Sequence, residues 1–187
     1  MKINIGVSAR HVHVTEEDVK ILFGEDYKLT EKSLLSQKGQ YACNEQVVIK
    51  GPKSEIERVR ILGPERNKTQ VEISKTDSFK LGINPPVRNS GDLDGASKIT
   101  IVGPNGSITK NAAIIAARHV HANYDDAKKY GLKEDEFVSI KINGEKSGIL
   151  SNVYVRLNEN FTFEAHIDTD DANAFLIKNG DEAELIV

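Results

Sequence analysis

A five-residue block that occurs twice constrains the fold of this chain more than any other feature. Ala-Arg-His-Val-His stands at residues 9–13 and again at residues 117–121. Two positions after each block comes a residue typical of helix N-caps, Thr15 in the first copy and Asn123 in the second. Asp18, three residues after Thr15, predicts a capping box at the start of the first helix. A repeated block with repeated surroundings indicates two related lobes.

Looser matches continue the repeat through the rest of each half. Val-Val-Ile-Lys at 47–50 corresponds to Val-Ser-Ile-Lys at 138–141. Val-Glu-Ile-Ser at 71–74 corresponds in the same way to Ala-His-Ile-Asp at 165–168. These matches extend the repeat from a short motif to most of each half, so we interpret it as an internal duplication.

The region between the two halves has the composition of a linker. Residues 85–97 contain two consecutive prolines and the turn-rich run Asn-Ser-Gly-Asp. We therefore expect a first β-barrel lobe over residues 1–90 and a second over residues 91–187. The exact boundary is open at this stage, and so is an exchange of strands between the lobes.

The apolar residues predict the fold class. In many short runs they occupy every second position, which is the pattern of half-buried strands, and Gly-Pro turns separate several of these runs. The helical stretches are few and short. Residues 112–117 fit either a strand or a helix, and we interpret them as strand. The pattern predicts a mainly β protein with two related β-barrel domains, each capped by short α-helices.

Composition and charge exclude several classes of protein. The longest apolar run, residues 112–117, is far shorter than the ~20 residues of a membrane-spanning helix, so we expect no membrane association. The net charge of −3 and the absence of a basic tail argue against nucleic acid as a partner. A single cysteine, Cys43, excludes an intrachain disulfide and fits a reducing compartment. We expect a cytoplasmic protein, and a homo-oligomer is compatible with the sequence.

Histidines indicate the chemistry, since four of the five lie in the two His-Val-His tripeptides. Side chains two positions apart on a strand share a face, so each tripeptide presents two imidazoles together, which is half of a typical divalent-metal site. The repeat aligns Glu72 with the fifth histidine, His166, and so suggests the third ligand of each site. We predict two metal sites, one formed by His11, His13 and Glu72 and the other by His119, His121 and His166.

Three protein ligands with an open position are typical of catalytic metal sites, and a histidine-rich set without cysteine suits Zn²⁺. Two alternatives remain. His11, His13 and Glu17 match the start of a cupin metal motif, which would imply a single-metal isomerase or oxygenase. The other alternative is a non-catalytic metal-binding module. Cys43 has no basic neighbour in sequence, and we interpret it as a buried apolar side chain rather than a nucleophile.

Long segments of the chain resemble one enzyme family, the phosphate propanoyltransferases, which are phosphotransacylases associated with propanediol utilisation. The segments are VSARHVHVTEED, GPKSEIERVRILGPERNKTQVEISKTD, PPVRNSGDL, ARHVH and HIDTDDAN, and they run in the family's order from about Ile5 to Asn173. The resemblance implies two β-barrel domains and a dinuclear metal site, usually zinc. It also implies the reaction of a short-chain acyl-CoA, propanoyl- or acetyl-CoA, with phosphate to give acyl phosphate and CoA.

The resemblance further implies roles for individual residues. Arg66 would bind phosphate and act in catalysis. Without a credible protein nucleophile, we expect direct transfer with no covalent acyl-enzyme. Members that enter bacterial microcompartments carry an additional N-terminal segment, for which the position of His11 leaves no room, so we expect a free cytoplasmic enzyme. The implied CoA contacts are Val7, Ser8, Ala9, Lys53, Arg60 and Asn173.

Overall fold

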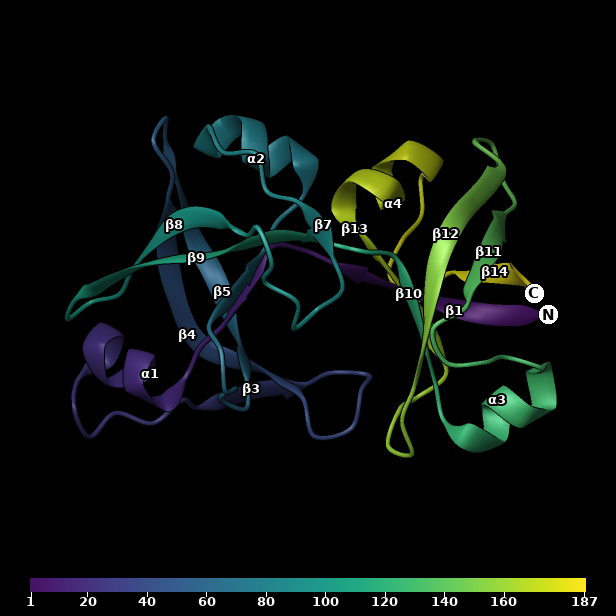
Figure 1. Cartoon of the computed structure of the whole chain (residues 1–187), viewed down its shortest axis with the longest axis horizontal. Coiled ribbons are helices and arrows are strands. Elements are labelled where there is room, and N and C mark those ends of the chain that lie inside the picture. Colours follow the sequence, from purple (N-terminus) through teal and green to yellow (C-terminus); the bar gives the residue numbers. More distant parts are fainter. The chain divides into compact units, whose positions relative to one another are not determined.

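A computed structural model describes the whole chain, residues 1–187, and contains two compact units (Figure 1). The first, here called the His11 unit, is Arg10–Ala116. The second, here called the His119 unit, consists of Met1–Ala9 together with Ala117–Val187. These bounds differ from a division at residue 90 for two reasons. The first strand pairs with strands from the end of the chain, and the strands within residues 97–116 pair with strands of the His11 unit. None of the helices has the length and apolar character that a bilayer-spanning helix needs.

The His119 unit is a closed six-stranded barrel with strand order β1-β13-β10-β12-β11-β14. Strand β1 is parallel to β13 and antiparallel to β14, so the N-terminal residues complete a barrel built otherwise from the C-terminal part of the chain. Its elements are β1 (Lys2–Ser8), β10 (His119–Ala122), α3 (Tyr124–Tyr130), β11 (Phe137–Ile142), β12 (Gly148–Leu157), β13 (Glu164–Asp168), α4 (Thr169–Phe175) and β14 (Glu182–Ile186).

The His11 unit contains a second ring of six strands, in which β4, β5, β2, β6, β9 and β8 pair in turn and β8 returns to β4. Strands β3 and β7 extend the sheet beyond this ring. Its elements are β2 (His11–His13), α1 (Glu16–Phe23), β3 (Glu31–Leu34), β4 (Tyr41–Lys50), β5 (Glu55–Gly63), β6 (Gln70–Glu72), α2 (Lys75–Leu81), β7 (Val87–Arg88), β8 (Ser97–Val102) and β9 (Ser107–Ala116).

The two rings share one pattern of parallel and antiparallel pairs. In each, the His-Val-His strand lies between a parallel neighbour and an antiparallel neighbour, which are β5 and β6 around β2 and β12 and β13 around β10. Strand β9 is parallel to β6 as β1 is parallel to β13. The expected fold class, a mainly β protein with two related barrels and short helices, is confirmed. The predicted strand at residues 112–117 is also confirmed, since it lies almost entirely in β9.

The two rings exchange strands: in each half of the chain, the strand that precedes the His-Val-His strand belongs to the other ring. Strand β1, in the barrel of the His119 unit, leads directly into β2 of the His11 unit. Strand β9 of the His11 unit leads in the same way into β10 of the His119 unit. Each His-Val-His strand therefore follows a strand that belongs to the other unit's barrel.

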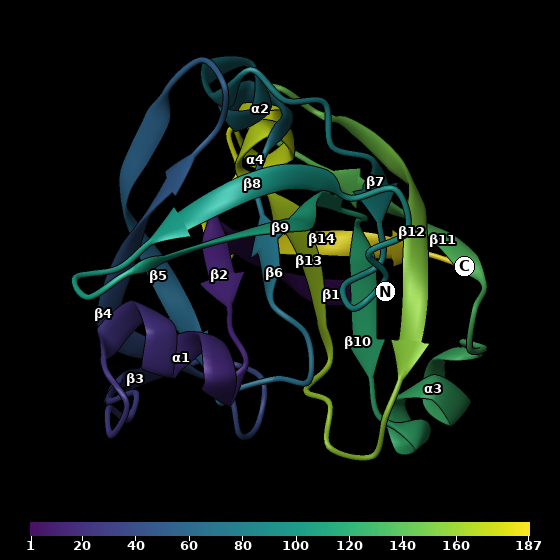
Figure 2. The same ribbon diagram turned by 60° about the vertical axis from the view of Figure 1, so that its left-hand side comes forward.

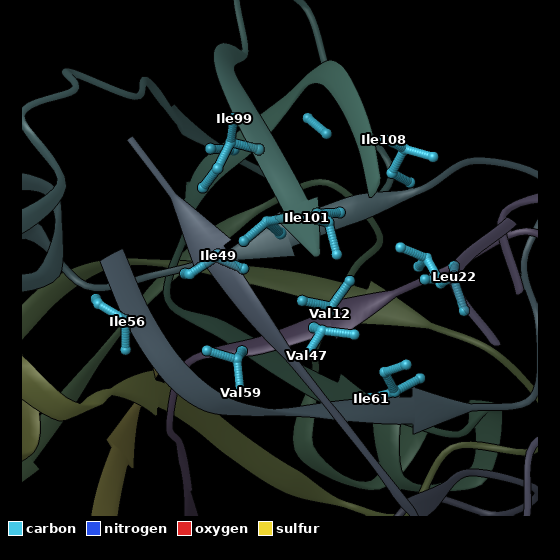
Figure 3. Close-up of a cluster of buried hydrophobic side chains, with 14 of the residues drawn as sticks. Val12, Leu22, Val47, Ile49, Ile56, Val59, Ile61, Ile99, Ile101 and Ile108 are labelled. Atoms are coloured by element: carbon cyan, nitrogen blue, oxygen red, sulfur yellow. The ribbon is translucent and has the colours of Figure 1, made fainter. Parts of the chain in front are cut away.

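Alternating apolar residues fill the barrel of the His11 unit, as the period-two pattern predicts (Figure 3). Val12, the central residue of the first His-Val-His, is fully buried there beside Ile61 of the neighbouring strand. Burying such a side chain stabilises the fold by about 1.5–3 kcal/mol. Packing of Val12 therefore fixes the strand that carries His11 and His13, while both histidines point to the opposite face.

Helix α1 begins at the predicted N-cap, Thr15, whose hydroxyl accepts a hydrogen bond from the Asp18 N–H at 3.1 Å. The expected capping box is incomplete. The Asp18 carboxylate accepts hydrogen bonds from Lys110 Nζ at 2.6 Å and from the Thr69 hydroxyl, and the Thr15 N–H donates to Thr69. Asp18 is therefore used to tie α1 to β9 and to the segment that precedes β6.

The segment expected as a linker, residues 85–97, lies inside the His11 unit. Its strand β7 pairs with β9, and the turn that follows contacts β6 through Ser90 and Gly91. The prolines and turn residues of this segment are therefore part of a folded unit. One of them, Ser90, hydrogen-bonds the predicted ligand Glu72.

Candidate metal centres

Three predicted ligands meet in the His11 unit. They lie on β2 and β6, which are adjacent antiparallel strands (Figure 2). His11 lies directly opposite Glu72, and His13 lies opposite Gln70. One ligand atom each from His11, His13 and Glu72 falls within 4.8 Å of the others, and all three residues are buried. We call these three residues the first ligand group.

Hydrogen bonds hold one oxygen of Glu72 in place. Its Oε1 accepts from Gln70 Nε2 at 2.6 Å and from Ser90 Oγ at 2.9 Å. Its Oε2 lies 3.5 Å from His11 Nε2. Gln70 is itself fixed, because its side-chain oxygen accepts from the Gly91 N–H at 2.7 Å. The carboxylate is thus oriented with one oxygen toward the histidines.

The electrostatics of the first ligand group favour the forms that bind metal. Burial, with the charges of His11 and Arg66, lowers the pKa of His13 to about 3, so its imidazole is neutral at pH 7. Burial alone would raise the pKa of Glu72, but His11 and the hydrogen bond from Ser90 bring it below its ordinary value. Neutral imidazole and ionised carboxylate are the ligand states that divalent metals require.

The second ligand group, in the His119 unit, consists of His119 and His121 on β10 and His166 on β13. Their candidate ligand atoms also lie within 4.8 Å of one another. His119 is opposite His166 in the strand register, and their rings stack with centroids 5.0 Å apart. The ring of Phe161 stacks on His121 at 4.0 Å. The structure brings together the three residues predicted for each site.

Sequence reasoning missed several residues that hold these ligands. Glu164 Oε2 lies 3.1 Å from Nε2 of the third ligand His166. In the other unit Gln70 makes the corresponding contact, a hydrogen bond to the third ligand Glu72. Both Glu164 and Gln70 stand two positions before the third ligand, so the period of a strand could have revealed them. Ser90 comes from an irregular turn, and no local pattern in the sequence indicates its contact.

Arg66 lies beside the first ligand group, as its expected role requires. Its Nη1 donates to Ser90 Oγ at 3.3 Å, and its charge contributes to the lowered pKa of His13. Its backbone N–H donates to the Val14 carbonyl at 2.8 Å, which fixes it one residue beyond β2. The half-buried guanidinium therefore reaches the same hydroxyl that hydrogen-bonds Glu72.

Cys43 is fully buried on β4. Burial and the charges of Glu45 and Glu65 raise its pKa to about 12, so the thiolate is strongly disfavoured near neutral pH. The structure supports the interpretation of Cys43 as an apolar core residue.

The six candidate CoA contacts are divided between the units, and their role stays a prediction. Arg60 lies opposite His11 in the strand register and donates to the backbone carbonyls of Cys43 and Asn44. Lys53 is exposed in the turn between β4 and β5. The His119 unit holds the others: Val7 and Ser8 at the end of β1, Ala9 after it, and Asn173 on α4.

The fold and the two ligand groups define a duplicated β-barrel protein in which each barrel assembles three ligands of the type that bind divalent metals. The family model described as Phosphate propanoyltransferase matches residues 4–178. The chain belongs to the phosphate propanoyltransferase family, and it is a transferase.

Curated relatives agree with this assignment. A phosphate propanoyltransferase from Thermotoga maritima is 51% identical over 181 residues, which cover 96% of this chain and 86% of the relative. One from Priestia megaterium is 54% identical over 180 residues, which cover 96% of this chain and 83% of the relative. One from Rhodobacter capsulatus is 46% identical over 178 residues, with 95% and 83% coverage.

The structure contradicts the cupin alternative, and the family match contradicts the alternative of a non-catalytic module. A cupin site would need Glu17 near His11 and His13, but Glu17 is exposed on α1 and stands outside the ligand group. A non-catalytic metal-binding module disagrees with a family of transferases.

Proposed function

We propose that this chain interconverts a short-chain acyl-CoA, propanoyl- or acetyl-CoA, and phosphate with acyl phosphate and CoA. The family match supports the reaction, and all curated relatives reported above carry the name phosphate propanoyltransferase. The observation that carries the proposal is the position of Arg66 beside the first ligand group. A guanidinium next to three metal ligands is suited to a phosphate dianion.

The proposal includes one divalent metal ion, zinc, in each ligand group, and the family resemblance implies that the two ions form one dinuclear site. The donor chemistry fits, since each group offers three imidazole or carboxylate ligands and no thiolate. His13 Nδ1 lies 3.2 Å from the Leu62 carbonyl, and His119 Nδ1 lies 2.9 Å from the Ala117 carbonyl. Such contacts orient the ring and leave Nε2 for the metal.

In the proposed reaction a phosphate oxygen attacks the thioester carbonyl carbon, a C–O bond forms, the C–S bond breaks and CoA leaves as thiolate. Arg66 would donate two N–H groups to the phosphate and orient it toward the carbonyl. Bound metal would supply positive charge to the phosphate oxygens and to the leaving thiolate. The buried thiol of Cys43 supports direct transfer without an acyl-enzyme.

The partners in this proposal are acyl-CoA, CoA, phosphate and acyl phosphate. For CoA we keep the six predicted contacts in β1, α4 and the β4–β5 region as candidates. A cytoplasmic location remains part of the proposal, and the single, buried, unpaired thiol of Cys43 is compatible with a reducing compartment.

The deciding experiment measures release of free CoA thiol from propanoyl-CoA by the zinc-loaded protein, with and without phosphate. Release that requires phosphate, with propanoyl phosphate as the second product, supports the proposal. Release without phosphate would make the protein a thioesterase. A protein that holds two zinc ions per chain and releases no thiol would contradict the proposed reaction while leaving the metal sites intact.

A further inference from the structure

The arginine of each repeated Ala-Arg-His-Val-His block makes the same contact in both units. Arg10 donates from Nε to Asp77 Oδ2 at 2.8 Å, and its Nη2 lies 2.8 Å from Asp77 Oδ1. Arg118 donates to Asp171 in the same side-on manner, from Nε at 2.6 Å and from Nη2 at 2.7 Å. The contact therefore occurs independently in two folded units.

The two aspartates occupy equivalent places near the third ligands. Asp77 is the third residue of α2, which starts two residues after the end of the strand that carries Glu72. Asp171 is the third residue of α4, which starts directly after the strand that carries His166. In each unit five positions separate the third ligand from the aspartate. Each pair thus joins the residue before the His-Val-His strand to the helix after the third ligand.

The geometry of these pairs is suited to fixing position. A guanidinium that binds both oxygens of a carboxylate allows little rotation, unlike the single contact of a lysine. The Asp77 side chain is only 6% exposed, and its backbone N–H donates to the N-cap Ser74. Arg118 is held further by a 3.0 Å hydrogen bond to the Ser151 carbonyl. Both aspartates are therefore fixed in the first turn of a helix, and Arg118 is tied in addition to β12.

The neighbouring strands need such a second connection because their pairing is short. β2 and β6 each contain three residues, and only His11 to His13 pair with Gln70 to Glu72. The strands are antiparallel, so Arg10 stands at the end where β6 leaves for α2. A pair at this end stops the two ligand-bearing strands from separating where His11 faces Glu72.

We propose that Arg10 and Arg118 are positioning residues that set the distance between the paired histidines and the third ligand of each group. The proposal rests on the proposed function only in taking these groups to be metal ligands. In this proposal Arg10 and Arg118 hold the metal ligands in position, and neither contacts the substrate.

The experiment compares zinc binding by the full-length protein with that of Arg118→Ala and Arg10→Ala, through competition with a chelating dye. We expect each variant to bind one of its two zinc ions at least about 10-fold more weakly, with the other ion unchanged. Cobalt substitution would identify the altered site, because a three-histidine site and a two-histidine, one-carboxylate site give different visible spectra. Lys141→Ala and Lys50→Ala, which remove exposed ion pairs with Glu184 and Glu55, are the controls.

Two further measurements separate positioning from general loss of stability. Ethylguanidinium should restore part of the zinc affinity of Arg118→Ala, while ethylammonium should not. If an alanine variant does not fold, Arg118→Lys replaces it, and it should show a smaller, still site-specific loss because lysine keeps the charge without the paired hydrogen bonds.

The outcomes are distinguishable. The proposal is overturned if a folded Arg118→Ala protein binds both zinc ions with wild-type affinity. It is also overturned if the affinities for the two ions fall equally. A wild-type protein that binds no zinc contradicts the proposed function instead. In that case the ¹⁵N chemical shifts of the His119 and His121 imidazoles test the positioning role. A change in Arg118→Ala but not in Lys141→Ala supports the role, and unchanged chemical shifts overturn it.

Discussion

Gly6 lies directly beside His166 on the neighbouring parallel strand, and a Cβ at position 6 would come within 3.0 Å of His166 Nδ1. The same atom would lie 3.2 Å from the Glu164 carboxyl carbon. The absence of a side chain at Gly6 therefore leaves room for the pair formed by His166 and Glu164.

Gly6→Ala should weaken metal binding in the His119 unit without unfolding the barrel. The added methyl group must displace the His166 ring by a few tenths of an ångström, and a ligand shifted by that distance binds metal less well. We expect about a tenfold loss of zinc affinity for one ion, measured by chelator competition. Asn4→Ala, at an exposed position of the same strand, should bind both ions normally. Unchanged affinity in Gly6→Ala would show that this close approach has no role.

Gln70→Ala should lower both stability and metal affinity in the His11 unit. The substitution removes the 2.6 Å hydrogen bond to Glu72 and leaves the Gly91 N–H without its acceptor. Losing hydrogen bonds of a buried side chain costs about 1–3 kcal/mol of unfolding free energy. Urea denaturation would measure this cost, with Gln40→Ala as the control. A variant as stable as the wild-type protein would mean that water replaces the Gln70 side chain.

Arg66→Ala should raise the KM for phosphate far more than the KM for CoA. The guanidinium lies near the first ligand group, where we place the phosphate, and its loss removes a charge-assisted contact with that substrate. Steady-state kinetics with each substrate varied in turn would show the difference. Lys68→Ala removes an exposed cation from the same segment and should change neither constant. Equal effects on both constants would refute the assignment of Arg66.

The metal-free protein should lose stability as the pH falls below about 6.5. Burial, with the charges of His11 and Arg66, lowers the pKa of His13 to about 3, whereas in the unfolded chain the same imidazole takes up a proton near its ordinary value of 6.5. The contribution of neutral His13 is thus fully present above pH 6.5 and is lost progressively as the pH falls toward 3. Thermal unfolding between pH 8 and pH 5 would measure it, and His13→Gln should flatten the dependence.

Cys43 should resist alkylation in the native protein. Burial and two nearby glutamates raise its pKa to about 12, so at pH 8 the thiol is both inaccessible and protonated. Iodoacetamide followed by intact-mass measurement should give modification only after denaturation. Because the folded pKa lies above the ordinary value of 9, the contribution of Cys43 to stability falls as the pH rises above 9. Rapid labelling of the native chain would contradict its place in the core.

The repeated block predicted much of what the structure contains. The period of a strand placed His11 and His13 on one face, and alignment of the halves identified Glu72 and His166 as the third members of the two groups. Thr15 starts a helix as predicted, because N-capping depends only on residues close in sequence. Local patterns were therefore sufficient for the His-Val-His strands and for the cap, and the internal repeat supplied the third ligands.

Features that depend on distant residues could not be predicted in this way. Asp18 prefers Lys110 and Thr69 to the N–H of Thr15, and neither partner is near it in sequence. Ser90 reaches Glu72 from a turn that was interpreted as a linker. The pairing of β1 with β13 and β14 follows from closing a whole barrel, which no local pattern encodes.

The exchange of β1 and β9 between the barrels has a consequence for how the protein is made. β1 leaves the ribosome before every strand of the His11 unit, yet its partners β13 and β14 are synthesised after all of them. During translation the His11 unit can therefore close while both edges of β1 are still unpaired, and the second barrel must wait until β14 has been made. Stop codons placed just before Glu182 should thus leave nascent chains with one finished barrel and an N-terminal strand exposed to chaperones or to aggregation.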